Sequence, residues 1–304
     1  MSSRRVVIVL CGFILMPLTV FSGTMGHNSP TNDHSVYWGI FGGVGAHDRI
    51  YTSQSGMSYR YIGDLYPGQA APTDVNYNLH VNVMGTSQTN NGVIAGIHVG
   101  YLMNELQFGT KTGVNLVPRI ELESYYLGSK MSGTLTNPVL EPAVLRPEGT
   151  VSPANSISAN QHVFVDDFNL NSGVLMLDTL FDLRTSLSQN YIPYAGVGLG
   201  VLFNTLSKAN SDQIMPFNED VNHFNSNTKA SSTLLAAQTR VGLRTQIASH
   251  LSVFAEYRYI YGAASSYTFG NTYYPGLHPE TSPWNVSLGS MNFQTGIIGL
   301  DYVC

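Results

Sequence analysis

The sequence predicts an all-β fold: an antiparallel up-and-down transmembrane β-barrel of about eight strands, with long extracellular loops and short periplasmic turns. Three observations predict it. Eight segments alternate apolar with polar or small residues, charged residues within these segments share one parity, and the connections alternate between short and long. The composition agrees, because only 11% of the 304 residues are charged, while glycine (30) and tyrosine (18) are abundant.

Each segment is long enough for a tilted membrane-spanning strand of about 9–11 residues. The eight segments are 35–47, 92–103, 113–127, 168–183, 191–205, 234–247, 250–262 and 291–304. The long connections between them are 49–91, 128–167, 206–233 and 263–290. An alternating run at 75–83 predicts that the second strand extends above the membrane. The first two long connections could each hold a further hairpin, so ten strands are the alternative to eight.

The N-terminus has the organisation of a cleaved signal peptide. Arg4 and Arg5 form a basic start, residues 6–20 form an apolar stretch, and small or apolar residues precede a cleavage point before Gly23. An apolar stretch of about 15 residues is short for a helical span of about 20, which argues against an anchor helix. The predicted organisation is a signal peptide at 1–22, a periplasmic tail at 23–34 and an outer-membrane barrel at 35–304.

Charged residues in the strands fall on the parity opposite to the apolar ones. In the third segment Ile120 and Leu122 alternate with Glu121 and Glu123. A single Arg or Lys facing lipid at the bilayer midplane would cost about 2–4 kcal/mol, so these charges must face inward. The predicted interior polar network is Arg119, Glu121, Glu123, Asp178, Asp182, Arg240, Arg244, Glu256 and Arg258.

Four basic and five acidic side chains in this network nearly balance. Buried charges need partners, and a barrel of eight strands is narrow enough to be filled by side chains. We therefore expect a paired core that closes the lumen. A narrow, gated polar pore is the alternative.

Outward-facing aromatic residues form an independent pattern. With the N-terminus in the periplasm, they fall into two belts at the levels of the two membrane interfaces. The predicted periplasmic belt is Trp38, Tyr101, Tyr191 and Tyr302. The predicted outer belt is Tyr126, Phe203, Tyr259 and Tyr261.

Other features limit the function. The formal net charge of −5 argues against a nucleic-acid partner. Cys304 is the one cysteine after the predicted signal peptide, so no intramolecular disulfide and no cysteine-based metal site is expected, whereas an intermolecular disulfide stays open. We expect no cofactor and no metal. His98 is expected to be a hydrogen-bonded interior histidine.

Catalysis has one candidate position. His47 and Asp48 lie near the predicted outer rim, where a hydrolase acting on lipid A would carry its site. The sequence has neither a GxSxG nor an HExxH motif. We therefore expect the protein not to be an enzyme.

Three stretches carry a family resemblance: GIHVGY at 96–101, PYAGVGLG at 193–200 and VFAEYRY at 253–259. With them the chain resembles the small bacterial outer-membrane β-barrel superfamily of OmpA-like and opacity-type barrels. Gly299, Tyr302 and Cys304 resemble the C-terminal assembly signal of such barrels, although Cys304 replaces the usual terminal Phe. The SGTMG junction at 22–26 resembles the mature start of Legionella-type outer-membrane proteins.

The resemblance implies insertion by the barrel-assembly machinery, with outer-membrane lipid and lipopolysaccharide as surroundings. The long loops are rich in Tyr, Asn and Phe and include Trp284, a composition that suits recognition. We therefore expect a structural or surface-exposed role, as a surface antigen or adhesin whose loops contact the host or the environment. A small passive porin is the alternative, and a lipid-A hydrolase is a third reading.

Overall fold

A computed structural model describes residues 35–59, 77–107, 114–137, 143–150, 157–159, 161–185, 191–275 and 278–304. These residues form sixteen strands of one antiparallel sheet. The predicted signal peptide and periplasmic tail lie outside the described residues, so both stay predictions. Within the described ranges, no helix has the length and apolarity needed to cross a membrane.

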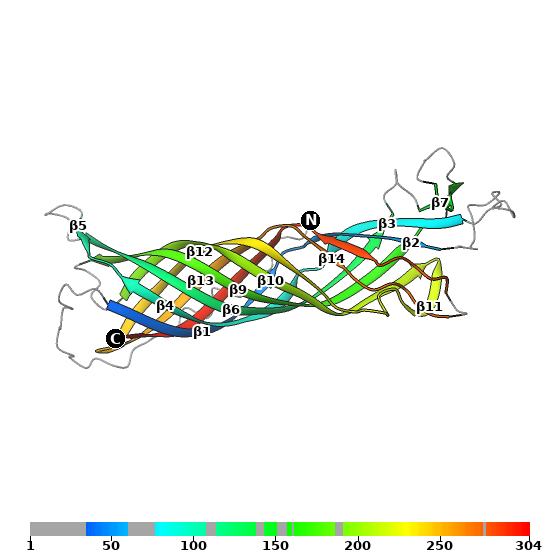
Figure 1. The fold of residues 1–304 in the computed structure, drawn as a ribbon. Coiled ribbons are helices and arrows are strands. Elements are labelled where there is room, and N and C mark those ends of the chain that lie inside the picture. Colours follow the sequence, from blue (N-terminus) through cyan, green and yellow to red (C-terminus); the bar gives the residue numbers. More distant parts are fainter. Residues whose placement is uncertain are drawn as a thin grey trace, which may run out of the picture. The chain divides into compact units, whose positions relative to one another are not determined.

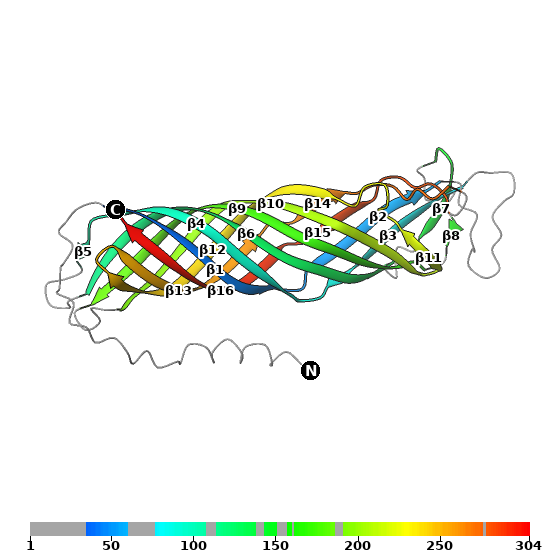
Figure 2. The same ribbon diagram turned by 90° about the horizontal axis from the view of Figure 1, so that it is seen from below.

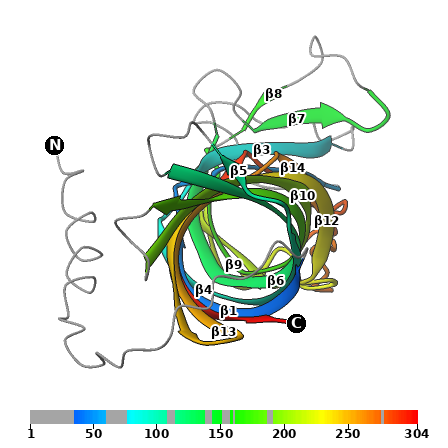
Figure 3. The same ribbon diagram turned by 90° about the vertical axis from the view of Figure 1, so that its left-hand side faces the viewer.

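Eight strands close into a ring, which confirms the predicted fold class (Figures 1 and 3). They are β1 (Ser35–His47), β4 (Asn90–Leu102), β6 (Val114–Thr136), β9 (Val163–Thr185), β10 (Tyr191–Met215), β12 (Ala230–Ala248), β13 (Leu251–Gly262) and β16 (Met291–Val303). Each pairs with the next, and β16 returns to β1 with Trp38 opposite Tyr302. The ring thus uses one strand from each of the eight predicted segments.

Eight further strands lie outside the ring, and all but one of them lie at the same end of it (Figures 1 and 2). They are β2 (Tyr51–Ser58), β3 (Tyr77–Ser87), β5 (Leu106–Gln107), β7 (Val144–Pro147), β8 (Ile157–Ser158), β11 (Phe217–Asn222), β14 (Ser265–Thr268) and β15 (Asn285–Leu288). After short breaks, β2 follows β1 and β3 leads into β4, while β14 follows β13 and β15 leads into β16. β15 pairs with β2, and β3 pairs with both β2 and β6. β5 lies at the opposite end, where it pairs with β6.

We distinguish two parts of this barrel. The membrane half comprises β1, β4, β12, β13, β16 and residues 114–128, 173–185 and 191–204 of β6, β9 and β10. The extension comprises β2, β3, β11, β14, β15 and residues 129–136, 163–172 and 205–215 of the same three strands. Thus β6, β9 and β10 run through both parts without a break.

The polarity of β9 reverses along its length while its alternation continues unbroken. In the membrane half, its outward side chains are apolar and its inward ones include charges: Leu175, Leu177, Phe181 and Leu183 face out, and Asp178 and Asp182 face in. In the extension the order is opposite: Asp167, Asn169 and Asn171 face out, and Phe164, Phe168 and Leu170 face in. The extension therefore has the polar surface and apolar core of a water-soluble barrel.

Stacked aromatic rings build the core of the extension. Phe224 and Phe269 stack with centroids 4.6 Å apart, and Phe168 lies 5.6 Å from Phe269. Trp284 is 2% exposed and donates its Nε1–H to Thr272 Oγ1 at 3.1 Å. The expectation that Trp284 serves recognition from a long loop is therefore wrong. Its large aromatic ring is buried in the core, where its packing is favourable and no partner can reach it.

Candidate functional site

All nine side chains of the predicted interior network lie inside the membrane half and are at most 9% exposed. Arg240 stands at the centre. Its guanidinium lies 2.6 Å from Glu121 and 2.9 Å from Glu256. It also reaches Glu123 at 3.4 Å and Asp178 at 3.5 Å. One arginine from β12 thus joins carboxylates from three other strands across the lumen.

The ion pairs continue from this centre toward the end of the barrel that carries the C-terminus. Arg119 bridges Glu121 and Asp182, at 2.9 Å each. Arg244 then joins Asp182, at 3.3 Å, to Asp301, at 2.6 Å. His98 Nε2 completes the series 2.7 Å from Asp301 Oδ1. The expectation that His98 is a hydrogen-bonded interior histidine is consistent with this contact.

Aromatic rings hold the guanidinium groups in place. Tyr37 donates its hydroxyl to Glu121 at 2.6 Å and packs against Arg119, whose guanidinium carbon lies 5.4 Å from the ring centroid. Arg258 lies 4.4 Å from the Phe41 ring centroid and pairs with Glu123 at 2.8 Å. Such cation–π contacts add attraction where water is excluded.

Sequence reasoning missed several members of this network. Asp301 and the rings of Tyr37, Tyr125 and Tyr194 were not assigned to it. Asp301 lies on the inward parity of β16, so extending the charge count to the last segment would have found it. The tyrosines carried no signal in the sequence, because an inward tyrosine can equally fill a lumen without touching a charge.

Side chains fill the described lumen closely. A cavity lined by His47, Leu127 and Phe293, and another lined by Thr52, Met131 and Asp166, each offer about 10 Å³. That volume holds about one water molecule. Glycines make room for the larger groups: a methyl group added at Gly198 would collide with the Asp178 carboxylate.

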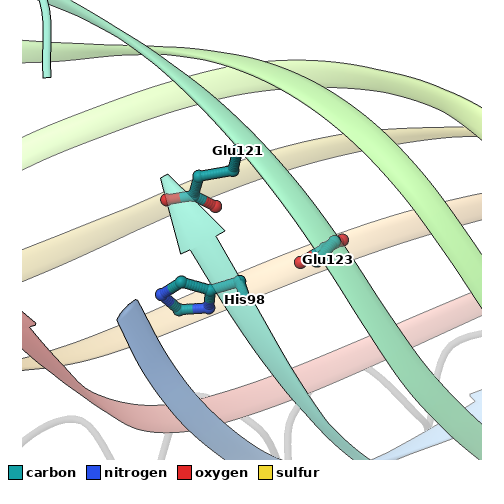
Figure 4. A group of neighbouring side chains, drawn as sticks. All are labelled: His98, Glu121 and Glu123. Atoms are coloured by element: carbon teal, nitrogen blue, oxygen red, sulfur yellow. The ribbon is translucent and has the colours of Figure 1, made fainter. Parts of the chain in front are cut away.

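Three members of the network, His98, Glu121 and Glu123, have the donor set of a metal site (Figure 4). One ligand atom from each lies within 4.8 Å of the others. The same carboxylates, however, already accept hydrogen bonds from Tyr37, Arg119, Arg240 and Arg258. A metal ion here would displace at least one guanidinium, so this donor set fits an ion-pair network better than a metal centre.

His47 and Asp48 do not form an open site at a rim. His47 is 1% exposed, and its two ring nitrogens lie 2.8 and 3.1 Å from the carbonyl oxygens of Asp48 and Lys130. The predicted position of His47 at the rim is wrong, because β2 and β3 carry the barrel beyond it.

The structure places all eight aromatic belt residues on the outer surface. The four periplasmic-belt side chains are 39–50% exposed and the four outer-belt side chains 37–51%. Trp38 and Tyr302 lie side by side, with ring centroids 6.0 Å apart. In the other belt, Tyr126 and Phe203 flank Gly173 at one level of the sheet. Of the predicted assembly signal, Gly299 and Tyr302 lie in β16 and Cys304 is exposed.

The core of the extension contains a second polar cluster, which the sequence analysis did not identify. Ser211 lies opposite Asp166 in the β9–β10 ladder. With its amide oriented to satisfy both ends, Gln54 donates to the Asp166 carboxylate, 3.1 and 2.6 Å from its two oxygens, and accepts from the Ser211 hydroxyl at 3.1 Å. His223 Nδ1 lies 2.9 Å from the Ser211 carbonyl oxygen. We call these four residues the Ser211 bridge.

Burial shifts both titratable groups of the Ser211 bridge toward their neutral forms. It raises the pKa of Asp166 to about 8, with the hydroxyl of Ser211 acting in the opposite direction. It lowers the pKa of His223 to about 4, and the neighbouring His278 and His162 contribute in the same direction. Both groups are therefore neutral at neutral pH.

The Ser211 bridge has the residue types of a hydrolase triad but a different geometry. The imidazole of His223 contacts the carbonyl oxygen of Ser211, whereas a triad needs a contact with the hydroxyl. Asp166, Ser211 and His223 are each at most 1% exposed. This arrangement ties strands together and does not present a nucleophile to solvent.

At the far end of the extension, the β10–β11 hairpin exposes an apolar tip. Ile214, Met215 and Phe217 are 49%, 50% and 74% exposed. Ile214 pairs with Phe217 across the turn, and the exposed Asp212 lies beside it. We call Ile214, Met215 and Phe217 the hairpin tip.

No family model and no curated protein matches this sequence. Among solved structures, the outer-membrane protease OmpT from Escherichia coli is similar over 91% of this chain and 99% of its own, with 8% identity and a TM-score of 0.31. The translocator domain of the autotransporter NalP from Neisseria meningitidis covers 85% and 88%, with 9% identity and a TM-score of 0.22. A Pseudomonas aeruginosa FadL homologue covers 88% and 90%, with 7% identity and a TM-score of 0.22.

The comparison with OmpT requires one correction. The expectation that the protein is not an enzyme is wrong as an exclusion, because a protease is among the similar solved structures. At this level of similarity the comparison assigns no activity to this chain. The ring of eight strands, its apolar outer surface and its buried charges establish the conclusion on fold: the chain forms a membrane-spanning antiparallel β-barrel.

Proposed function

We propose that the protein resides in the bacterial outer membrane and holds the extension above the surface as a rigid platform for contact with a partner. The hairpin tip carries this proposal. The outward side chains of β9 from Asp167 to Asn171 are polar, whereas the tip exposes three large apolar side chains at the membrane-distal end. Three large apolar side chains exposed within four residues support an interaction site there.

The partner suited to the hairpin tip is a protein with an apolar pocket. Fully burying a Leu, Ile, Met or Phe side chain contributes about 1.5–3 kcal/mol, and these three are already partly covered. One tip therefore binds weakly, and many copies on a cell surface would act together through avidity. The acidic Asp212 beside the tip disfavours a negatively charged bilayer as the partner.

The filled lumen supports a platform function and argues against a channel function. The ion pairs of the membrane half cross the lumen from wall to wall, and the aromatic core of the extension lies above them. Water and ions need a continuous open path, which the side chains of both parts occupy. An OmpA-like or opacity-type relationship and a surface-antigen or adhesin role belong to the same proposal.

The test measures binding of bacteria that display the protein to cultured epithelial cells. Replacing all three tip residues (Ile214→Ser, Met215→Ser, Phe217→Ser) should lower binding at least tenfold, because the apolar anchor is lost. The matched control replaces three outward polar residues of the extension (Ser207→Ala, Ser266→Ala, Thr268→Ala) and should bind normally. Equal binding by the tip variant and the control would show that the tip does not carry the contact.

Pretreating the epithelial cells with trypsin separates the possible partners. A protein partner predicts that binding falls to the level of the tip variant. Undiminished binding after trypsin would reject the protein pocket and leave lipid or glycan as the contact. Heat-modifiable gel mobility of each variant checks that its barrel is folded.

A further inference from the structure

The Ser211 bridge crosses the interior of the extension from wall to wall. Gln54 lies on β2, Asp166 on β9, Ser211 on β10, and His223 directly follows β11. All four are at most 1% exposed. The His223 ring packs edge-on against Phe164 and Trp284, with centroids 5.0 and 5.7 Å away. The bridge thus joins four separate segments at one point within an apolar core.

Like charges surround each titratable end of the bridge. The charged groups that act on Asp166 are the carboxylates of Asp167 and Asp212, and its hydrogen-bonding neighbours, Gln54 and Ser211, are uncharged. The groups that act on His223 are two further imidazoles, His278 and His162. His278 has its ring centroid 5.2 Å from that of His223. Ionising either end would therefore place a buried charge next to others of the same sign.

We propose that the Ser211 bridge is a pH-sensitive lock, which holds the extension closed while Asp166 is protonated and His223 is neutral. Opening exposes both groups to water, where each regains its ordinary affinity for protons. The lock regulates the state of the platform and does not depend on what the hairpin tip binds.

The sign of the pH effect follows from proton linkage. The pKa of Asp166 is about 8 in the closed state and 3.8 ordinarily. Its contribution to the stability of the closed state is therefore full below pH 3.8 and is lost as the pH rises to about 8. The pKa of His223 is about 4 in the closed state and 6.5 ordinarily, so its contribution is full above 6.5 and is lost as pH falls to about 4. Between pH 4 and 6.5 the effects of the two groups on the stability of the closed state cancel. Above pH 6.5 Asp166 alone lowers this stability as the pH rises.

Trp284 provides the readout, because it lies against His223 and is one of only two tryptophans in the chain. In a Trp38→Phe background, urea-induced exposure of Trp284 in detergent-refolded full-length protein gives the equilibrium constant for opening. This constant should be nearly unchanged from pH 4.5 to 6.5. It should then rise about eightfold from pH 6.5 to 8, because the effect of Asp166 levels off as the pH approaches its closed-state pKa of about 8.

Two variants separate the two ends of the bridge. Asp166→Asn should abolish the rise above pH 6.5 and leave opening easier at pH 4.5 than at 6.5. His223→Asn should extend the rise, so that opening becomes about 100-fold easier from pH 4.5 to 6.5. The control Asp48→Asn, at an exposed carboxyl outside the bridge, should keep the original profile.

A starting protein whose opening is independent of pH between 6.5 and 8 would overturn the proposal. So would an Asp166→Asn variant that retains the rise. If that variant does not fold, the His223→Asn profile decides alone, since a lock predicts a continuous rise from pH 4.5 and a merely structural cluster does not. These readouts require no binding partner, so they are independent of the proposed platform function.

Discussion

The membrane half and the extension share three continuous strands but have opposite interiors. In the membrane half, Arg240 and its carboxylates occupy the lumen, whereas in the extension the rings of Phe224 and Phe269 do. Along β9 the parity of inward and outward side chains never changes. The strand geometry is therefore the same in both parts, and the surrounding solvent decides which face is apolar. Lipid outside favours polar groups inside, and water outside favours the reverse.

The two interiors also hold their walls together by different forces. Apolar packing in the extension tolerates the loss of one contact in proportion to the area lost. The ion-pair network of the membrane half is less tolerant, because removing one partner leaves buried charges without compensation.

The largest predicted effect comes from removing the central guanidinium. Arg240→Ala removes the closest cationic partner of Glu121, at 2.6 Å, and one of the two guanidinium partners of Glu256, at 2.9 Å. The free energy of unfolding in detergent should fall by about 3–5 kcal/mol, the range for breaking a buried ion pair. Urea unfolding followed by heat-modifiable mobility measures it. A change below about 1 kcal/mol would mean that the network is not the main support of this half.

A charge on the outer face should have unequal effects in the two halves. Val241 faces outward on β12 in the membrane half, and Ser266 faces outward on β14 in the extension. Val241→Arg should lower the free energy of unfolding by about 2–4 kcal/mol, because it places a cation against lipid. Ser266→Arg should change it by at most about 0.5 kcal/mol, as for other surface positions. Equal losses at the two sites, measured by urea unfolding in vesicles, would contradict the division into two halves.

The smallest predicted effect concerns metal. Because guanidinium groups already occupy the carboxylates beside His98, adding zinc or EDTA should shift the unfolding free energy by less than about 0.5 kcal/mol. Thermal unfolding at both conditions checks this. A zinc-dependent rise in stability that His98→Ala abolishes would instead assign a metal site to the donor set of Figure 4.

The sequence alone was sufficient for the eight ring strands and for the inward direction of their charges. Both follow from a period of two, which is a local property of each strand. Arg240 and Val241 could be assigned to opposite faces for this reason alone. The aromatic residues at the two interfaces follow from the same local geometry.

Only ring closure decided which charges meet. Arg240 and Glu121 are 119 residues apart and come together because β6, β9, β10 and β12 are consecutive walls of one barrel. The inclusion of Asp301 and Tyr37 in the network has the same cause. His47 was misplaced because alternation within one strand does not tell where neighbouring strands end.

The apolar interior of the extension and the Ser211 bridge were also beyond the sequence. Alternation by itself is satisfied equally by a polar or an apolar lumen, and Phe168 and Asp178 share the same parity in one strand. Whether the lumen is polar or apolar depends on whether lipid or water surrounds the barrel at that height. The Ser211 bridge depends in addition on four segments that meet around Ser211. Local sequence therefore determined the direction of each side chain, whereas the surrounding solvent and the closed tertiary structure determined what each side chain meets.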